Sequence, residues 1–405
     1  MFKKLLRNTG PGPLIAAAFI GPGTVTLCTL VGVQYQLDLL WAIVISILAA
    51  IALQGMAVRI GLITGQGIVS VMRNELRHPP LKLLLISLIL SAILIGNTAY
   101  EAGNISGAVL GLETLFGKHS IPLGTFNINS YSLIVGGLAG ILLWIGRYKV
   151  IEKSMFALVV LMSIAFLVTA IATGPSLVKI LKGIFAFTHP SGSLLTIIGL
   201  IGTTIVPYNL FLHSALVREK WTDASQLPYA IKDMVIAMGL GGVISLSIII
   251  TAASIHQTQV ETAADLAQGL VPLFGSFAKY FVAIGLFAAG ITSTLTAPLA
   301  AAYVVSDCLQ WKPHLSDLRF RSVGLFIILF GILISSIGIK LILIIKFAQI
   351  TNGILLPIIA ALLLWLVNKH SVLGTFRNNK IQNIFGICIV LFTLLLSIRT
   401  LIFLF

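Results

Sequence analysis

Two short stretches decide the fold of this chain: 18-AFIGPGTVTL-27 and 201-IGTTIVPYNL-210. Each lies in a long apolar run, and each carries a proline near the middle of that run, Pro22 in the first and Pro207 in the second. A proline inside a helix removes a backbone hydrogen bond, and unpaired carbonyls are tolerated inside a membrane only where they face protein or a water-filled cavity. The sequence therefore predicts two broken helices that line a common interior site.

The composition requires a membrane as the solvent of this protein. Of its 405 residues, 58% are hydrophobic and 9% are charged, and its mean hydropathy is +1.06. A soluble domain needs about 25% charged residues to cover its surface. We therefore expect an all-α integral membrane protein whose residues 1–405 form a single transmembrane domain in the lipid bilayer. The net charge of +14 predicts no nucleic-acid partner, because the basic residues lie scattered in short loops instead of on one patch.

Apolar runs of about 20 residues predict membrane-spanning helices. Eleven are expected, over residues 12–34, 39–64, 82–112, 131–146, 154–174, 194–217, 232–255, 277–307, 322–339, 341–368 and 382–404. Pro22 and Pro207 are 185 positions apart, and each break opens a block of five helices. This spacing is typical of an inverted five-plus-five repeat with a binding site at the middle of the membrane. The first repeat is expected at about 12–174, the second at about 194–368, and 382–404 is an extra helix.

The distribution of Lys and Arg predicts the orientation. Basic residues concentrate in alternate loops, whereas the opposite loops carry only Lys118, Lys179, Lys182, Lys279 and Lys340. Because basic residues favour the cytoplasmic side, we expect a multi-pass protein of the inner membrane with its N-terminus in the cytoplasm.

Enzyme chemistry is not expected. The chain has no phosphate-binding loop and no zinc-protease or hydrolase motif, so no catalytic residue and no cofactor are predicted. Its three cysteines, Cys28, Cys308 and Cys388, lie far apart in apolar runs and are expected to be packing residues. A secondary transporter is therefore the favoured class of protein.

Four stretches resemble one known family over nearly the whole chain. They are GPGPLIAAAFIGPGT (10–24), AVRIGLITGQ (57–66), IGTTIVPYNLFLHSALV (201–217) and GITSTLTAP (290–298). These segments are similar to the Nramp family (natural resistance-associated macrophage proteins) of divalent-metal transporters. The resemblance implies a LeuT-type fold with broken helices 1 and 6, and ion-coupled alternating access.

The chain departs from that family at the metal ligands. Where the family usually reads Asp-Pro-Gly-Asn, this chain has Gly21 and Thr24, and where it reads Met-Pro-His, this chain has Val206 and Tyr208. A carboxylate and a soft thioether are thus missing. Neutral oxygens remain at the backbone carbonyls freed near Gly21 and Thr203 and on side chains. The expected substrate-binding set is Gly21, Thr24, Thr203, Thr204, Val206, Tyr208, Asn209 and Gln349, with the identity of any metal left open.

Two ionisable residues are expected well within the helices. A charged residue at the bilayer centre costs about 2.5–3.5 kcal/mol on insertion scales, so such residues are candidates for function. The resemblance places Glu101 and His213 on the proton pathway, although Thr98 replaces a family aspartate one turn before Glu101. The alternatives are a neutral, hydrogen-bonded acid and a packing histidine.

Other polar residues leave the coupling ion open between H⁺ and Na⁺. The hydroxyls of Thr292, Ser293 and Thr294 could serve a sodium ion or pack between helices. Lys346 could extend toward the membrane surface, replace a coupling cation or face an anion.

Three functions remain open from the sequence. The first is a Nramp-related carrier of a divalent metal cation with altered selectivity, coupled to H⁺. The second is a carrier of a small anion or organic acid, coupled to H⁺ or Na⁺, on the same scaffold. The third is a membrane sensor that does not transport.

Overall fold

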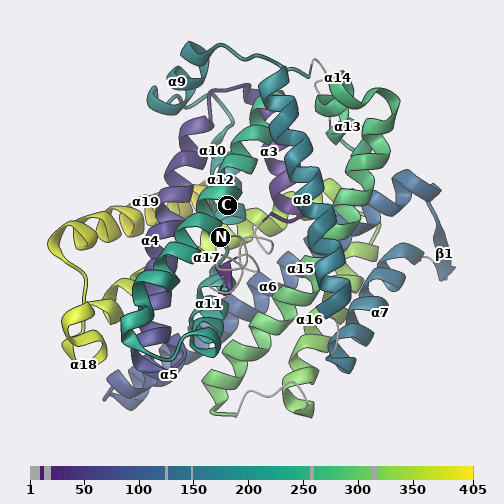
Figure 1. Ribbon diagram of the computed structural model, residues 1–405. Helices are drawn as coiled ribbons and strands as arrows, with labels where there is room; N and C mark the ends of the chain where they lie inside the picture. The colour runs from purple at the N-terminus through teal and green to yellow at the C-terminus, as the bar shows by residue number, and fades with distance from the viewer. Residues whose placement is uncertain are drawn as a thin grey trace.

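A computed structural model describes residues 10–12, 20–123, 126–146, 149–255, 260–311 and 317–404. The membrane-spanning elements are α3 (Pro22–Tyr35), α4 (Leu40–Thr64), α6 (Pro79–Phe116), α7 (Ser130–Ile145), α8 (Lys149–Ala172), α10 (Leu194–Thr204), α11 (Pro207–Lys220), α12 (Leu227–Ala252), α15 (Ala278–Leu309), α16 (Leu318–Ser336), α17 (Leu341–Val367) and α19 (Lys380–Leu404). Figure 1 shows them packed side by side in one bundle.

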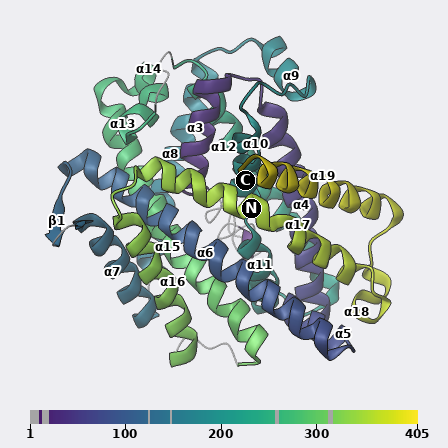
Figure 2. The ribbon, with the colours of Figure 1, turned by 180° about the vertical axis from the view of Figure 1, so that it is seen from behind.

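Short elements join these helices. They are α5 (Ile68–Glu75), α9 (Leu177–Phe185), α13 (Ala263–Leu266), α14 (Val271–Phe274), α18 (His370–Leu373), the 3-10 turns η1 (Ala224–Gln226), η2 (Gln268–Leu270), η3 (Gly275–Phe277) and η4 (Gly374–Phe376), and the antiparallel hairpin β1 (Ser120–Leu123) and β2 (Phe126–Asn129). In both views, α9, α13 and α14 lie at one end of the bundle, and α5 and α18 lie at the other (Figures 1 and 2).

All eleven predicted spans contain a helix. Nine helices of the described part of the chain are long and apolar enough to cross a membrane, with α10 and α11 counted together; α7 is apolar but shorter. The helix α3 is the second half of the first predicted span, and residues 13–19 of that span lie outside the described residues. Several boundaries differ, because residues such as Pro79 start a helix earlier than hydropathy alone indicates. The linker elements were not predicted, since their apolar segments are too short for the spanning pattern.

At both predicted breaks, the structure has a helix that begins at the proline. The helix α10 ends at Thr204 and α11 begins at Pro207, so Ile205 and Val206 form the break. The helix α3 begins at Pro22, with the extended residue Gly21 before it. Proline suits the first turn of a helix because the amide that it lacks has no partner there. The prolines therefore start the half-helices that the sequence places in mid-membrane.

Glycines allow the central helices to approach each other closely. A Cβ atom on Gly202 of α10 would overlap the backbone carbonyl oxygen of Gln349 on α17, and one on Gly353 of α17 would lie 2.5 Å from the carbonyl oxygen of Ile198. Because lipid is as apolar as the helices, the hydrophobic effect does not hold membrane helices together, and small residues allow the close van der Waals packing that does. The contact of α10 with α17 therefore depends on having no side chain at these positions.

The outer surface of the bundle is apolar, as contact with lipid requires. Large side chains such as Ile171 on α8, Leu395 on α19 and Leu329 on α16 are exposed. Cys28 and Cys308 are buried, as expected for packing residues, but Cys388 is exposed on α19 and that expectation was wrong for it. Cys388 is exposed because α19 lies at one edge of the bundle in both views (Figures 1 and 2) and covers the core with one face only.

Candidate functional site

The two broken helices meet through a pair of threonines. The hydroxyl oxygens of Thr24 on α3 and Thr203 on α10 are 2.8 Å apart, and both side chains are fully buried. Thr24 lies in the first turn after the Pro22 break, and Thr203 lies in the last turn before the Ile205 break. The structure thus brings together two residues that are 179 positions apart and that the sequence assigned to one site.

Gln349 of α17 forms a third side of this site. A Cβ atom on Gly23 would overlap the side-chain amide of Gln349, so the amide lies directly against the backbone of the α3 break. The Oε1 atom of Gln349 is buried and has no hydrogen-bond partner within the described residues. We call Thr24, Thr203 and Gln349 the break site.

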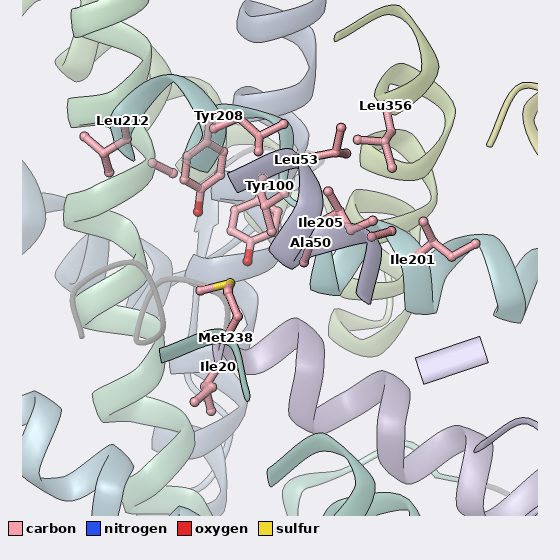
Figure 3. Close-up of a cluster of buried hydrophobic side chains, with 14 of the residues drawn as sticks. Ile20, Ala50, Leu53, Tyr100, Ile201, Ile205, Tyr208, Leu212, Met238 and Leu356 are labelled. Carbon is pink, nitrogen blue, oxygen red and sulfur yellow. The ribbon is translucent and has the colours of Figure 1, made fainter. Parts of the chain in front are cut away.

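The first turn of α11 adds an aromatic and an amide side chain. The rings of Tyr208 and Tyr100 pack edge to face with their centroids 5.2 Å apart, and Figure 3 shows both hydroxyls directed toward the side where Met238 lies. The Oδ1 atom of Asn209 is buried and lacks a partner among the described residues. Tyr208 and Asn209 supply polar atoms from the second half of the broken helix.

Three other predicted site residues present no free polar group to a substrate: two already form hydrogen bonds within their own helices, and the third has an apolar side chain. The carbonyl of Gly21 itself accepts a hydrogen bond from the amide of Val25 at 3.2 Å. The carbonyl that Pro22 leaves without a donor is four residues earlier, at position 18, outside the described residues. The hydroxyl of Thr204 donates to the carbonyl of Leu200 at 2.9 Å. Val206 is a buried apolar residue at the start of α11 and offers no side-chain ligand.

Glu101 lies on α6, on a different face of that helix from Tyr100. Its Oε2 accepts a hydrogen bond from Asn104 at 3.3 Å, while its Oε1 is buried and has no partner among the described residues. A Cβ atom on Gly331 of α16 would lie 2.7 Å from the Cγ atom of Glu101. On the same side, Asn97 donates to the carbonyl of Ala297 on α15 at 3.1 Å. We call Asn97, Glu101 and Asn104 the Glu101 cluster.

The other side of α6 contacts the helices of the break site. Gly107 lies against Pro22 of α3, and Gly103 lies against Ala348 of α17. At about 100° per residue, Glu101 is turned by about 160° from Gly103 and by about 120° from Gly107, whereas Asn104 lies between the two faces. Glu101 was predicted from sequence, but its separation from the break site was not; the glycine spacing Gly96, Gly103, Gly107 is the signal that marks the opposite face.

His213 lies one helical turn after Asn209 on α11. It is fully buried, and its Nδ1 atom lies 2.8 Å from the Oε1 of Gln54 on α4. Because an amide oxygen only accepts, Nδ1 carries the proton of this bond. The Nε2 atom is buried and has no partner in the described part of the chain. Gln54 was missed from sequence, since nothing in a lone glutamine of an apolar helix marks its partner.

The hydroxyls of α15 serve their own helix. Thr292 donates to the carbonyls of Ala288 and Ala289, and Thr294 donates to Gly290 and Ile291. Of Thr292, Ser293 and Thr294, only Ser293 has a hydroxyl without a partner among the described residues. This arrangement favours packing over a sodium site.

The chemistry available at the break site is that of neutral oxygens. Among the described residues, no group of three or more histidine, cysteine, aspartate or glutamate side chains could hold a metal ion. Hydroxyl and amide oxygens are ligands that hard cations accept. Their lack of charge predicts weak binding of a cation.

One family model and several known proteins match this chain. The model described as "Natural resistance-associated macrophage protein-like" matches residues 12–403. A divalent metal cation transporter MntH of Bradyrhizobium diazoefficiens is 29% identical, with 81% of this chain and 73% of the relative covered. The MntH of Staphylococcus saprophyticus is 27% identical, with 98% of this chain and 92% of the relative covered.

Solved structures share the fold. A manganese transporter of Eremococcus coleocola, in complex with an aromatic bis-isothiourea substituted compound, has a TM-score of 0.77 and 23% identity and covers 98% of this chain and 87% of its own. The transporter MhsT in complex with L-phenylalanine has a TM-score of 0.59 and 14% identity, covering 97% and 98%. These likenesses confirm the LeuT-type fold that the family resemblance implied.

Proposed function

This chain belongs to the Nramp family of membrane transporters, and we propose that it carries a small divalent metal cation by alternating access with altered selectivity, coupled to protons. The single observation that carries the proposal is the buried Thr24–Thr203 contact of 2.8 Å across the two helix breaks. We further propose that it lies in the inner membrane with its N-terminus in the cytoplasm, and that the repeats 12–174 and 194–368 move against each other around this contact.

The unpartnered oxygens of the site favour a cation. Gln349 and Asn209 each bury an oxygen atom with no partner among the described residues. Leaving such an atom unsatisfied costs about 1–3 kcal/mol. A cation that passes between the breaks would satisfy both oxygens together with the hydroxyls of Thr24 and Thr203.

Selectivity follows from the ligands that are absent. With Gly21 and Val206 where the family usually has an aspartate and a methionine, neither charge nor sulfur holds the ion. Sulfur is what favours softer transition metals over Mg²⁺. We therefore propose that Mn²⁺ and Mg²⁺ bind with similar, low affinity.

Proton coupling would act away from the substrate. Glu101 is a buried acid that directly follows Tyr100 on α6. Its side chain packs against Gly331 of α16. His213 holds a proton toward Gln54 and keeps Nε2 as a buried acceptor. Both residues can gain and lose a proton without touching the ion, so we propose two separate paths.

One observation supports a second candidate, a small anion. The first turns of α3 and α11 begin at the two breaks, and helix N-termini attract negative charge. Lys346 lies one turn before Gln349 on α17. An anion carrier on the same scaffold would use these groups in place of the oxygens.

Flux into proteoliposomes tests the proposal. Uptake of Mn²⁺, Mg²⁺ and a panel of small anions would be measured with and without a pH or sodium gradient, for the natural chain, for Thr203→Val and for Thr169→Val. Thr169 is a matched control because its buried hydroxyl donates to Ala165 of its own helix, α8. Cation uptake that Thr203→Val abolishes and Thr169→Val keeps is expected. Anion uptake would replace this proposal with the second candidate, and no uptake of any kind would indicate a sensor.

A further inference from the structure

A cavity of about 240 Å³ lies between α4, α10 and α19, outside the break site. These three helices contact one another along the edge of the bundle that α19 forms (Figure 1). The cavity is lined by Ile45, Ser46, Leu48, Ala49, Ile201, Ile205, Phe385, Cys388, Ile389, Phe392 and Thr393.

The wall of the cavity offers no polar group to a ligand. Its two hydroxyls are used within their own helices: Ser46 donates to Ala42 at 2.6 Å, and Thr393 donates to Ile389 at 2.8 Å. The remaining side chains are apolar apart from the thiol of Cys388. Water needs two or more polar partners to stay in such a space. The occupant that this lining accepts is therefore a hydrocarbon.

The cavity opens toward the lipid at mid-membrane depth. Leu48 and Phe385 at its rim are 49% and 41% exposed, and Cys388 is exposed as well. Ile201 and Ile205 are level with the helix break, which the fold places near the middle of the bilayer. Only acyl chains of lipids are present at that depth.

The cavity also touches the end of α10 that carries Thr203. Ile201 and Ile205 belong to the last turn of α10, closed by a 2.8 Å hydrogen bond from the Ile205 amide to the Ile201 carbonyl. Thr203 of the break site lies in the same turn. A ligand in the cavity that packs against Ile201 and Ile205 would therefore restrain the turn that carries Thr203.

We propose that this cavity is a binding site for one acyl chain of a membrane lipid, and that the bound chain steadies the last turn of α10. The site is separate from the proposed ion path, and its test does not need transport. The acyl chain enters between Leu48 and Phe385 and packs on Ile201 and Ile205.

Photo-crosslinking tests the binding. The natural chain is placed in lipid nanodiscs that contain phosphatidylcholine with a diazirine in the middle of one tail, and crosslinked residues are mapped by mass spectrometry. Crosslinks are expected to concentrate at least fivefold on peptides covering 45–49, 201–205 and 385–393. Crosslinks spread evenly over all lipid-facing helices would overturn the proposal.

A matched pair of variants on α19 sharpens the test. Cys388→Phe fills the cavity from its exposed wall, whereas Leu391→Phe adds a ring on the same helix at an exposed position that does not line the cavity. Cys388→Phe is expected to reduce crosslinking at 45–49 and 201–205 at least threefold, and Leu391→Phe to leave it unchanged. Equal effects of the two variants would contradict the site.

Hydrogen exchange tests the effect on α10. Because the filled cavity restrains the turn, the peptide covering 201–205 should exchange several-fold more slowly in nanodiscs than in a short-chain detergent, while Leu391→Phe keeps this difference. In Cys388→Phe, the attached ring takes the place of the acyl chain, so the difference between nanodisc and detergent should disappear. A difference that persists in Cys388→Phe would overturn the proposed restraint.

Discussion

The break site and the Glu101 cluster contact different faces of α6 and are built in opposite ways. The break site joins Thr24 and Thr203, which are carried by interrupted helices. The Glu101 cluster is carried by α6, an uninterrupted helix of 38 residues. The break site has no charged side chain, while the cluster holds a buried carboxyl group. The comparison shows that the interrupted helices α3 and α10 carry neutral polar groups at the break, whereas the continuous helix α6 carries the buried carboxyl group of Glu101.

The largest loss of stability is expected at the close backbone contact between α10 and α17, next to the break site. Gly202→Ala should lower the free energy of unfolding by about 1–3 kcal/mol or more, because its Cβ atom would overlap the Gln349 carbonyl and the backbone has little room to move. Gly137→Ala on α7 is the control, since nothing lies within 4 Å of its Cβ position. Thermal unfolding in detergent measures both variants, and equal stability of the two would contradict the close α10–α17 contact.

A smaller loss is expected on the other side of α6. Gly331→Ala should cost less stability than Gly202→Ala, because the backbone atom nearest to its new Cβ position is 3.3 Å away, whereas a Cβ atom at Gly202 would overlap backbone. The closer atoms, at 2.7 and 3.0 Å, belong to the side chains of Glu101 and Ile105. The same thermal unfolding experiment compares the two alanine variants. A larger loss at Gly331 would show that the Glu101 cluster, and not the break site, is the more rigid region.

The acid of the cluster should control pH dependence without controlling the fold. Glu101→Gln keeps the shape of the side chain and much of its hydrogen bonding, so the protein should fold normally while cation uptake loses its dependence on pH. His213→Ala should weaken that dependence less, because its ring is held by Gln54 of α4 on the second of the two proposed paths. Uptake measured in proteoliposomes across a pH series checks both, and a natural pH profile in Glu101→Gln would remove proton coupling through this residue.

Much of the fold could be predicted because its signals are periodic or local. Apolar runs indicated the helices, and Pro22 and Pro207 indicated the breaks. The meeting of Thr24 with Thr203 followed from the two breaks together with the family resemblance. The position of Glu101 could not be predicted, because one residue along α6 turns the side chain by about 100° from the face of Tyr100. The bond between His213 and Gln54 joins residues 159 positions apart, and no local pattern contains it.

The smallest effect concerns the hydroxyl pair itself. In a double-mutant cycle, Thr24→Val and Thr203→Val should show a coupling energy of about 0.6 kcal/mol, the mean for side-chain hydrogen bonds between membrane helices. Unfolding by sodium dodecyl sulfate in mixed micelles measures each variant. The pair Thr24→Val and Thr169→Val should be additive, because Thr169 bonds within α8. Additive effects of the first pair as well would remove the hydroxyl contact from the account.

Calorimetry with Mn²⁺ tests most directly the claim that the break site binds its cation through neutral oxygens alone. The natural chain should give no binding heat at micromolar Mn²⁺, and the triple variant Gly21→Asp, Thr24→Asn, Val206→Met should give a clear one, because it restores the carboxylate, amide and thioether typical of the family. Thr203→Val in the triple variant should weaken that heat, which assigns it to this site. Tight Mn²⁺ binding by the natural chain would contradict the account.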